Sequence, residues 1–547
     1  MLVRVQSVPA AASSAVVFHW WSVIVSALLF LNVVIMPLKA YISEPLPWAL
    51  TLQESISGCT SNFTACEASL LTAFRARSRS MPNGTSYVFG STFDLVRLPL
   101  TIGVKSNEDT SFLLQTTYGQ FYSTRVRREI LEVGARRRNA TDFHALQVSR
   151  MAGVVAAYTI FWTDVSITES PSEIHLYVGM QLPSYSAAWH WSKFLGRCCM
   201  AGALAWLMWR RYYRHFVHLA KSLRRVGLPI TAPKQRYYVI VGDPTSLVLS
   251  EPILCGLFIC DFFVSSDFAS RALVRICQTH DWVAFLTASL YLSRTVWCGY
   301  ASMALVSKVL QKYPSLAFEP VDPGILAVVI FVVAGPVTYL QSRSLLVITI
   351  YTAIDSCLLS ERGQEEGTEG LLGAVFFVTV FASLPLLYGF GMPLLSRFWR
   401  RGQVAPGPRI AAKTMSSILG GAFDTNDAKH RWLLRLNLLV FRASIKTTGF
   451  QSTGGSLNAL FATDACYKRH RGISQTGTDA YILYVATSAD AINGRWTSAR
   501  LGLLSCAHTL PMMCDATKMP LACAVSWLEL HPSILLHHGV DASPWVM

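Results

Sequence analysis

Charged residues are scarce in this chain. Asp, Glu, Lys and Arg together make up 14% of its 547 residues, whereas an average soluble domain carries about 25%. Hydrophobic residues make up 52% and gather in long runs with little charge. This composition argues against a soluble globular protein and predicts a multi-pass integral membrane protein.

Acidic residues are the scarcer sign of charge, which leaves a formal net charge of +15. An excess of this size is also found in proteins that bind nucleic acid. Here the basic residues stand next to the apolar runs, where Lys and Arg mark the cytoplasmic ends of membrane spans. We therefore expect the lipid bilayer to be a partner of this chain, and we expect no nucleic acid.

The sequence motifs of several enzyme classes are absent. The chain has no G-x4-G-K-[ST] phosphate loop, no G-x-S-x-G elbow, no H-E-x-x-H and no kinase motif set. Cys506, His508, Cys514 and Cys523 are spaced too widely for a zinc site. An enzyme is not excluded, but it is the less favoured interpretation. We expect no catalytic residue, metal or cofactor.

Three N-glycosylation acceptor sequences, by contrast, fall in one interval. Asn62, Asn83 and Asn139 are each followed by Thr two positions later, and all lie between the first and second apolar runs. Such asparagines are modified in secreted or lumenal segments. Residues 37–192 are therefore predicted to form a glycosylated extracellular or lumenal α+β domain. The protein would travel the secretory pathway, and we expect it at the plasma membrane.

The same interval holds two further candidate features. Cys59 and Cys66 flank the first acceptor site, and a disulfide between them is expected in an oxidising compartment. Arg125, Arg127 and Arg128 match the R-x-R-R pattern of secretory processing proteases, although three basic residues in a folded domain more often form a solvated surface.

Six apolar runs are candidates for membrane spans. They cover residues 15–36, 193–209, 246–264, 282–306, 324–340 and 371–395. The first is predicted to be an uncleaved signal anchor after a cytosolic segment 1–14, since it is longer than a usual signal peptide. A basic cytosolic loop, 210–245, and a cytosolic tail, 396–547, follow from the charge flanks. The predicted fold class is a membrane all-α protein with a polytopic six-helix core.

Two parts of this topology are less regular. The run 193–209 begins with Lys193 and Arg197, which we expect to extend outward to the interface. Residues 345–359 are apolar, but they are short for a span and contain Asp355. We interpret them as a re-entrant or interfacial segment. The alternative is a seventh span, which would place the tail outside.

Arg294 stands in the middle of the apolar run 282–306 and is a candidate intramembrane site. A central arginine is costly in a bilayer and needs a partner. The acidic candidates are Glu251, Asp261, Asp267 and Asp355. Asp261 and Asp267 match Arg294 poorly in depth, whereas Asp355 fits if its segment enters the membrane. Arg294 and Asp355 therefore form either a substrate or ion site or a structural ion pair.

Glycine and proline interrupt the last two runs, at Gly335-Pro336, at Pro385 and between Gly389 and Pro393. Broken helices of this kind expose backbone groups to substrates in transporters, but Gly and Pro are also common in ordinary membrane helices. Together with Arg294 they motivate a transporter or channel as an alternative function.

Three stretches, 238–252, 291–297 and 321–340, resemble a group of predicted multi-pass membrane proteins from oomycetes. The resemblance covers about residues 190–400. It implies a membrane core and no particular activity.

The size of the predicted outer domain suggests a function. About 150 residues outside the membrane exceed what topology requires. We therefore expect a receptor-like protein that binds an extracellular ligand or small molecule through this domain. A transporter or channel is the alternative, and a membrane-bound transferase is a third hypothesis that no motif favours.

Overall fold

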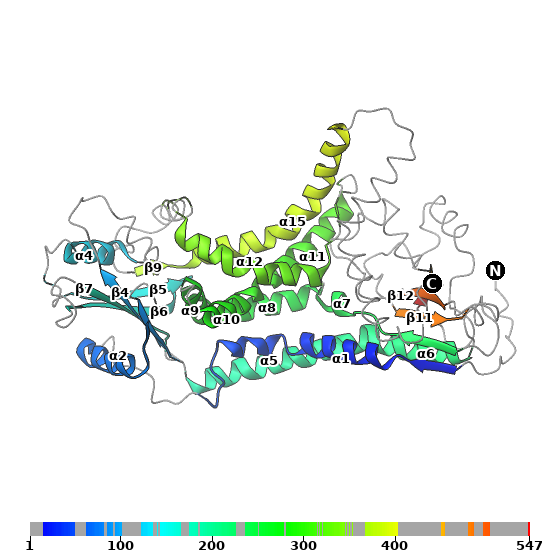
Figure 1. Ribbon diagram of the computed structural model, residues 1–547, viewed down its shortest axis with the longest axis horizontal. Helices are drawn as coiled ribbons and strands as arrows, with labels where there is room; N and C mark the ends of the chain where they lie inside the picture. The colour runs from blue at the N-terminus through cyan, green and yellow to red at the C-terminus, as the bar shows by residue number, and fades with distance from the viewer. Residues whose placement is uncertain are drawn as a thin grey trace.

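The fold is described from a computed structural model. It describes residues 15–49, 62–80, 85–90, 93–100, 122–134, 139, 143–165, 174–183, 186–225, 236–249, 251–277, 281–313, 316, 318–319, 321–344, 346, 349, 353, 367–402, 450–454, 480–485, 496–503 and 545–546. Within these ranges, two β-sheets lie at opposite ends of a set of long helices (Figure 1).

The helices include the apolar runs of the sequence and several more polar stretches. In chain order they are α1 (Trp20–Val34), η1 (Pro37–Ile42), α2 (Phe63–Arg77), α4 (Thr124–Gly134), α5 (Ala187–Met208), the π-helical turn η5 (Trp209–Tyr213), α6 (Arg214–Arg225), α7 (Thr245–Leu249), α8 (Pro252–Val264), α9 (Ser266–Cys277), α10 (Trp282–Leu292), η6 (Ser293–Thr295), α11 (Val296–Lys312), α12 (Pro323–Arg343) and α15 (Leu371–Gly402).

A seven-stranded sheet forms from the interval between the first two apolar runs and one later strand. Its order is β2 (Arg79–Ser80), β3 (Ser86–Phe89), β4 (Phe93–Leu100), β7 (Ile174–Gln181), β6 (Val154–Val165), β5 (His144–Met151) and β9 (Gly367–Glu369). Neighbours are antiparallel except for β5 and β9, which pair in parallel. The edge strand β9 comes from the connection directly before α15, so this connection ties the sheet to that helix.

Apolar residues on both faces of the seven-stranded sheet explain its two covering helices. Successive side chains of a strand point to opposite faces. Accordingly Phe161 packs in one cluster with α4, and Trp162 packs in another with α2. The two helices lie on opposite sides of the sheet (Figure 1). Helices therefore cover apolar residues on both faces of the sheet, in keeping with the apolar composition of β4 and β6.

A second sheet joins segments that are far apart in the chain. Its path is β1 (Ala15–Phe18), β8 (Arg236–Ile240), β11 (Ala480–Tyr484), β12 (Trp496–Leu503) and β10 (Phe450–Gly454), with β13 (Trp545–Val546) also paired to β12. Helix α6 packs on it through Phe216, Leu219 and Leu223. The first strand, the segment after α6 and the tail thus share one core.

The prediction of an all-α core of six membrane-spanning helices is wrong. Among the described residues, two helical stretches are long and apolar enough to cross a membrane, Pro323–Leu340 and Gly373–Leu395. The pair Pro252–Val264 and Ser266–Ile276 would add a third, but it is bent by 73°. The chain also contains the two sheets described above.

Two of the remaining predicted spans differ from straight helices for local reasons. The run 15–36 begins as strand β1 and continues as a helix of 15 residues, which is short for a bilayer. The run 282–306 changes from α-helix to a 3₁₀ turn at Ser293–Thr295. An apolar run in the sequence shows how long and how hydrophobic a segment is. It does not show whether the segment bends between short helices.

The proline-containing runs, in contrast, are continuous. Helix α12 passes through Pro336, and α15 passes through Pro385 and Pro393. Of the two alternatives that the sequence left open at these positions, the structure therefore shows ordinary continuous helices. The structure places the helix breaks before Pro252, at Ser265 and in the turn that contains Arg294.

Candidate functional site

Charged side chains from four separate elements meet between the helices, and we call this group the ionic cluster. It consists of Glu44 after η1, Lys193 and Arg197 of α5, Asp261 of α8 and Arg294 of η6. Aromatic rings pack against its cations, and Arg197 is fully buried. These ion pairs join residues that lie up to 250 positions apart in the sequence.

Glu44 is the centre of the ionic cluster. The guanidinium of Arg197 donates two hydrogen bonds of 2.8 Å to its two carboxylate oxygens. The Lys193 ammonium lies 3.1 Å from the same carboxylate, and the Tyr291 hydroxyl donates to it at 2.8 Å. A buried carboxylate with this many donors is well compensated.

Asp261 joins the two arginines of the cluster. The Arg197 Nε lies 2.9 Å from one Asp261 oxygen, and Arg294 donates to the other. Arg294 also lies 3.5 Å from Glu44 and packs over the ring of Tyr291. Arg294 therefore has two anionic partners and an aromatic face.

The electrostatics of the cluster keep Glu44 charged. Burial alone would raise the pKa of the Glu44 carboxyl, but Arg197, Lys193 and Arg294 outweigh burial and lower this pKa to about 2. Three cations face two anions, so the cluster carries one excess positive charge. Arginine stays protonated in proteins, so Arg197 and Arg294 cannot serve as proton carriers. The arrangement is a cross-link between η1, α5, α8 and η6.

A third carboxylate and a third arginine lie beside the cluster. Asp267 of α9 is buried, and neither of its carboxylate oxygens has a well-formed hydrogen bond among the described residues. It is close enough to Lys193 for an electrostatic interaction. Arg271, one turn later, donates to the backbone carbonyl of Ser43, next to Glu44. Helix α9 is thus joined to the segment that carries Glu44.

The structure brings together a different set of residues from the predicted one. Arg294 pairs with Asp261, which we had set aside on depth, whereas Asp355 lies outside the described residues. Lys193 and Arg197 do not extend outward but are buried against Glu44. The spacing of Lys193 and Arg197 could have predicted that they share a partner, because residues four apart lie on one face of a helix.

Polar contacts also connect the seven-stranded sheet to the helices. The Tyr87 hydroxyl donates a 2.6 Å hydrogen bond to Asp281, which caps the N-terminus of α10. Arg275 of α9 forms a 2.7 Å ion pair with Asp94 of β4, which is buried. Burial opposes ionisation of Asp281, but the bonds from Tyr87 and from two backbone amides outweigh it and lower the pKa of this carboxyl.

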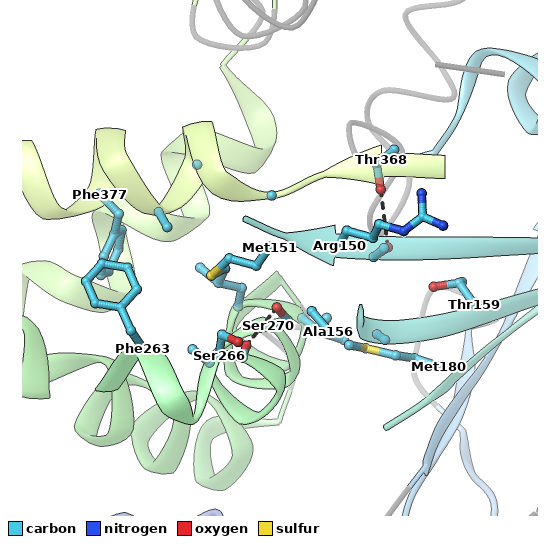
Figure 2. Close-up of a pocket in the computed structure, with 18 of the residues that line it drawn as sticks. Arg150, Met151, Ala156, Thr159, Met180, Phe263, Ser266, Ser270, Thr368 and Phe377 are labelled. Atoms are coloured by element: carbon cyan, nitrogen blue, oxygen red, sulfur yellow. Dashed lines mark hydrogen bonds between the residues drawn. The ribbon is translucent and has the colours of Figure 1, made fainter. Parts of the chain in front are cut away.

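A cavity of about 90 Å³ lies at the same junction, and we call it the junction pocket. One wall comes from strands β5 and β6, and the other comes from the α8–α9 bend and the start of α15. Figure 2 shows the aromatic rings of Phe263 and Phe377 on the helix side and Thr368 on the strand side. Sheet and helices thus build this pocket together.

The lining of the junction pocket is mainly apolar, with hydroxyl groups at its edges. On the strand side, Thr368 forms hydrogen bonds with Gln147 and Ser149, at 3.1 and 3.2 Å. On the helix side, Ser270 donates to the backbone carbonyl of Ser266. Arg150 is the one charged residue among the described lining residues, and its guanidinium points away from the phenyl rings (Figure 2).

The predicted modification sites stay predictions, but three of their residues have a described place. Asn62 is exposed and caps the N-terminus of α2. Asn139 is exposed, whereas Asn83 lies outside the described residues. Cys66 is disulfide-bonded, and Cys59, its expected partner, also lies outside the described residues.

The predicted processing site lies in a helix. Arg125, Arg127 and Arg128 occupy the first turns of α4. Arg125 pairs with Glu129 at 2.9 Å, and Arg127 donates to the carbonyl of Tyr122. A protease that cuts extended segments would have to unfold this helix, so the placement favours a surface role.

Comparisons with protein-family models, with curated proteins and with solved structures found no match. The resemblance to the oomycete membrane proteins stays a prediction, and function has to be inferred from the residues of this chain.

Proposed function

We propose that this protein is a receptor-like membrane protein that binds a ligand in the junction pocket and passes the binding event to its helices. The main observation behind the proposal is the construction of the pocket. The seven-stranded sheet forms one wall, and α8, α9 and α15 form the other. A ligand held between two such bodies changes the free energy of their contact, which is the requirement for coupling.

The membrane location is supported by the helices themselves. Two apolar helices are long enough to cross a bilayer. Helix α5, although it carries the buried cations, has exposed tryptophans near both ends, including Trp189 and Trp209. These two positions lie about 30 Å apart along a helix, close to the thickness of the hydrocarbon core. Tryptophan is enriched at both membrane interfaces.

The partition of segments between the two sheets supports the expected sidedness. The interval 37–192 was predicted outside, and it supplies strands β2 to β7 of one sheet, whose edge strand β9 pairs with β5. The loop 210–245 and the tail were predicted inside, and they supply β8 and β10 to β13 of the other sheet, which β1 joins from the start of the first apolar run. Passage through the secretory pathway to the plasma membrane is part of the proposal.

Coupling from the sheet to the helices has a direct route. Strand β9 ends at Glu369 and α15 begins at Leu371, so a shift of this edge strand moves the helix. The bonds from Tyr87 and Asp94 to α10 and α9 hold the rest of the sheet against the bundle. The ionic cluster holds η1, α5, α8 and η6 together, so β9 and α15 can move relative to a rigid set of helices.

The transporter hypothesis has less support. Its main residue, Arg294, is paired with Asp261 and Glu44, and the helices with proline are continuous. A substrate would have to displace these partners. The transferase hypothesis still has no motif in its favour.

The experiment that tests the proposal is recovery of a pocket-bound compound. Full-length protein would be purified from eukaryotic membranes in mild detergent, and extracted compounds would be compared by mass spectrometry. The variants Ala156→Leu and Ala374→Leu fill the pocket from opposite walls, and Ala68→Leu on the exposed face of α2 is the matched control.

We expect a compound that is enriched in the wild type and the control and depleted in both filled variants. Each variant must first elute as a folded, monodisperse species. If all four proteins yield the same compounds in the same amounts, the pocket is not the ligand site and the proposal fails.

A further inference from the structure

We infer that the junction pocket takes an uncharged alcohol, with its short apolar chain between the phenyl rings and its hydroxyl at the Ser266 side of the cavity. This inference rests on the proposed function and adds the chemical class of the ligand. The lining of the pocket, its size and the exposed apolar side chains beside it support this inference.

The lining excludes a charged ligand. An ion in an apolar cavity needs a paired charge. Among the described lining residues Arg150 alone is charged, and it is exposed and directed away from the rings (Figure 2). None of the members of the ionic cluster lines the pocket, and they are bonded to one another. A neutral ligand meets no such penalty.

Two hydroxyl groups of the lining can recognise a polar end. Ser266 and Thr159 line the pocket, and neither side chain makes a hydrogen bond to the residues that the structure describes. Ser266 stands next to Phe263 on the helix wall (Figure 2). A serine hydroxyl both donates and accepts, as an alcohol does. Ser266 thus gives the pocket one polar contact that can donate or accept, beside an otherwise mainly apolar lining.

The size of the cavity limits the apolar part. About 90 Å³ is smaller than the engineered cavity of roughly 150 Å³ that holds benzene. A short chain is therefore favoured over a ring system. Met151 and Met180 belong to the lining, and their flexible thioethers can adjust to the shape of a chain.

Exposed apolar side chains lie beside the helix wall of the pocket. Phe263 lines the pocket and is 38% exposed, and its neighbour Val264 is 45% exposed. Val375 and Phe376, beside the lining residues of α15, are also exposed. A ligand that is dissolved in the bilayer or at its surface can enter there without crossing charged groups.

The test is a chain-length series of alcohols on full-length protein in phosphatidylcholine nanodiscs. Ethanol, butanol, hexanol and octanol would be titrated, with ligand-observed NMR as the readout. Burial of each added methylene should raise affinity about fourfold. We expect this increase to stop within the series once the cavity is full, whereas partitioning into the bilayer continues to rise with length.

Variants separate the pocket from the bilayer. Ala156→Leu and Ala374→Leu should each remove the saturable signal, and Ala68→Leu should keep it. Ser266→Ala should weaken butanol binding about 2- to 10-fold, the loss expected for one hydrogen bond. The matched control is Ser192→Ala, on an exposed position of α5, which should leave butanol binding unchanged.

Charged analogues complete the test. Butyrate and butylammonium should bind at least tenfold more weakly than butanol. Stronger binding of either ion, or a saturable butanol signal that survives in both filled variants, overturns the inference. If the compound recovered from membranes depends on the pocket but is charged, the alcohol class fails while the receptor-like function stands. If neither compound nor alcohols depend on the pocket, both fail.

Discussion

At the scale of single residues, Glu44 has the largest influence on the buried charges. It accepts bonds from Arg197, Lys193 and Tyr291, and its pKa is lowered to about 2. Removal of one member of a buried ion pair costs more than the pair itself contributes, because the remaining charges stay in an apolar environment without compensation.

We predict that Glu44→Gln destabilises the protein by about 3–5 kcal/mol, the cost of leaving buried cations without a partner. Chemical unfolding in detergent, followed by tryptophan fluorescence, measures this. Glu67→Gln is the control, since Glu67 pairs with His144 near the surface and should contribute less than about 1 kcal/mol. Equal effects of the two substitutions would contradict the prediction.

The same carboxylate predicts a dependence on pH. Its pKa in the folded protein, about 2, lies below the ordinary value of 4.5. Its contribution to stability is therefore fully present above about pH 4.5 and is lost as the pH falls towards 2. The difference in unfolding free energy between wild type and Glu44→Gln should shrink over this interval. A constant difference from pH 7 to pH 3 would argue against an ionised Glu44.

Arg294 is predicted to act as a structural partner of Asp261. Arg294→Met, Asp261→Asn and the double variant form a thermodynamic cycle, with unfolding free energy as the readout. Because the two side chains are in direct contact, the double variant should be less destabilised than the sum of the single variants by about 0.5–3 kcal/mol. Additive effects would mean that the ion pair contributes nothing, and Arg294 would again be a candidate for a transport site.

At the scale of elements, two glycines of α15 illustrate how closely the helices pack. A Cβ atom added at Gly389 would overlap the ring of Phe318, whereas one added at Gly391 would meet nothing within 4 Å. The backbone carbonyl of Gly389 also accepts a 2.8 Å bond from the amide of Glu319. The segment before α12 therefore rests directly on α15.

We predict opposite effects of alanine at these two positions. Gly389→Ala should lose about 1–3 kcal/mol through overpacking, and Gly391→Ala should be neutral or gain up to about 1 kcal/mol, because alanine is the better helix former. Thermal unfolding of the two purified variants measures the difference. If both substitutions have the same effect, the contact between Phe318 and α15 is not present in solution.

At the scale of the whole molecule, two sheets at opposite ends of the helices divide the chain into two sides. The division can be tested by glycosylation. Asn62 and Asn139 are exposed, so we predict that each Asn→Gln change removes one mass shift on glycosidase treatment. An acceptor site inserted at residues 486–495, between β11 and β12, should stay unmodified. Glycosylation there would place the second sheet outside.

The local pattern of the sequence was sufficient for some elements and insufficient for others. The runs 324–340 and 371–395 were predicted as spans, and the helices Pro323–Arg343 and Leu371–Gly402 confirm them as candidates. Each is a single apolar segment, for which composition determines structure. The run 15–36 was misjudged, because its first residues pair with β8, more than 200 residues later.

The sequence by itself determined the apolar character of the chain, two of its candidate spans and the need of Arg294 for an acidic partner. Only the tertiary structure decided which partner that is, joined Lys193 and Arg197 to Glu44, and formed a pocket between β5, β6 and three helices. The physical reason is distance along the chain. Hydrophobicity acts residue by residue, whereas ion pairs, sheet order and cavities depend on segments that meet only after folding.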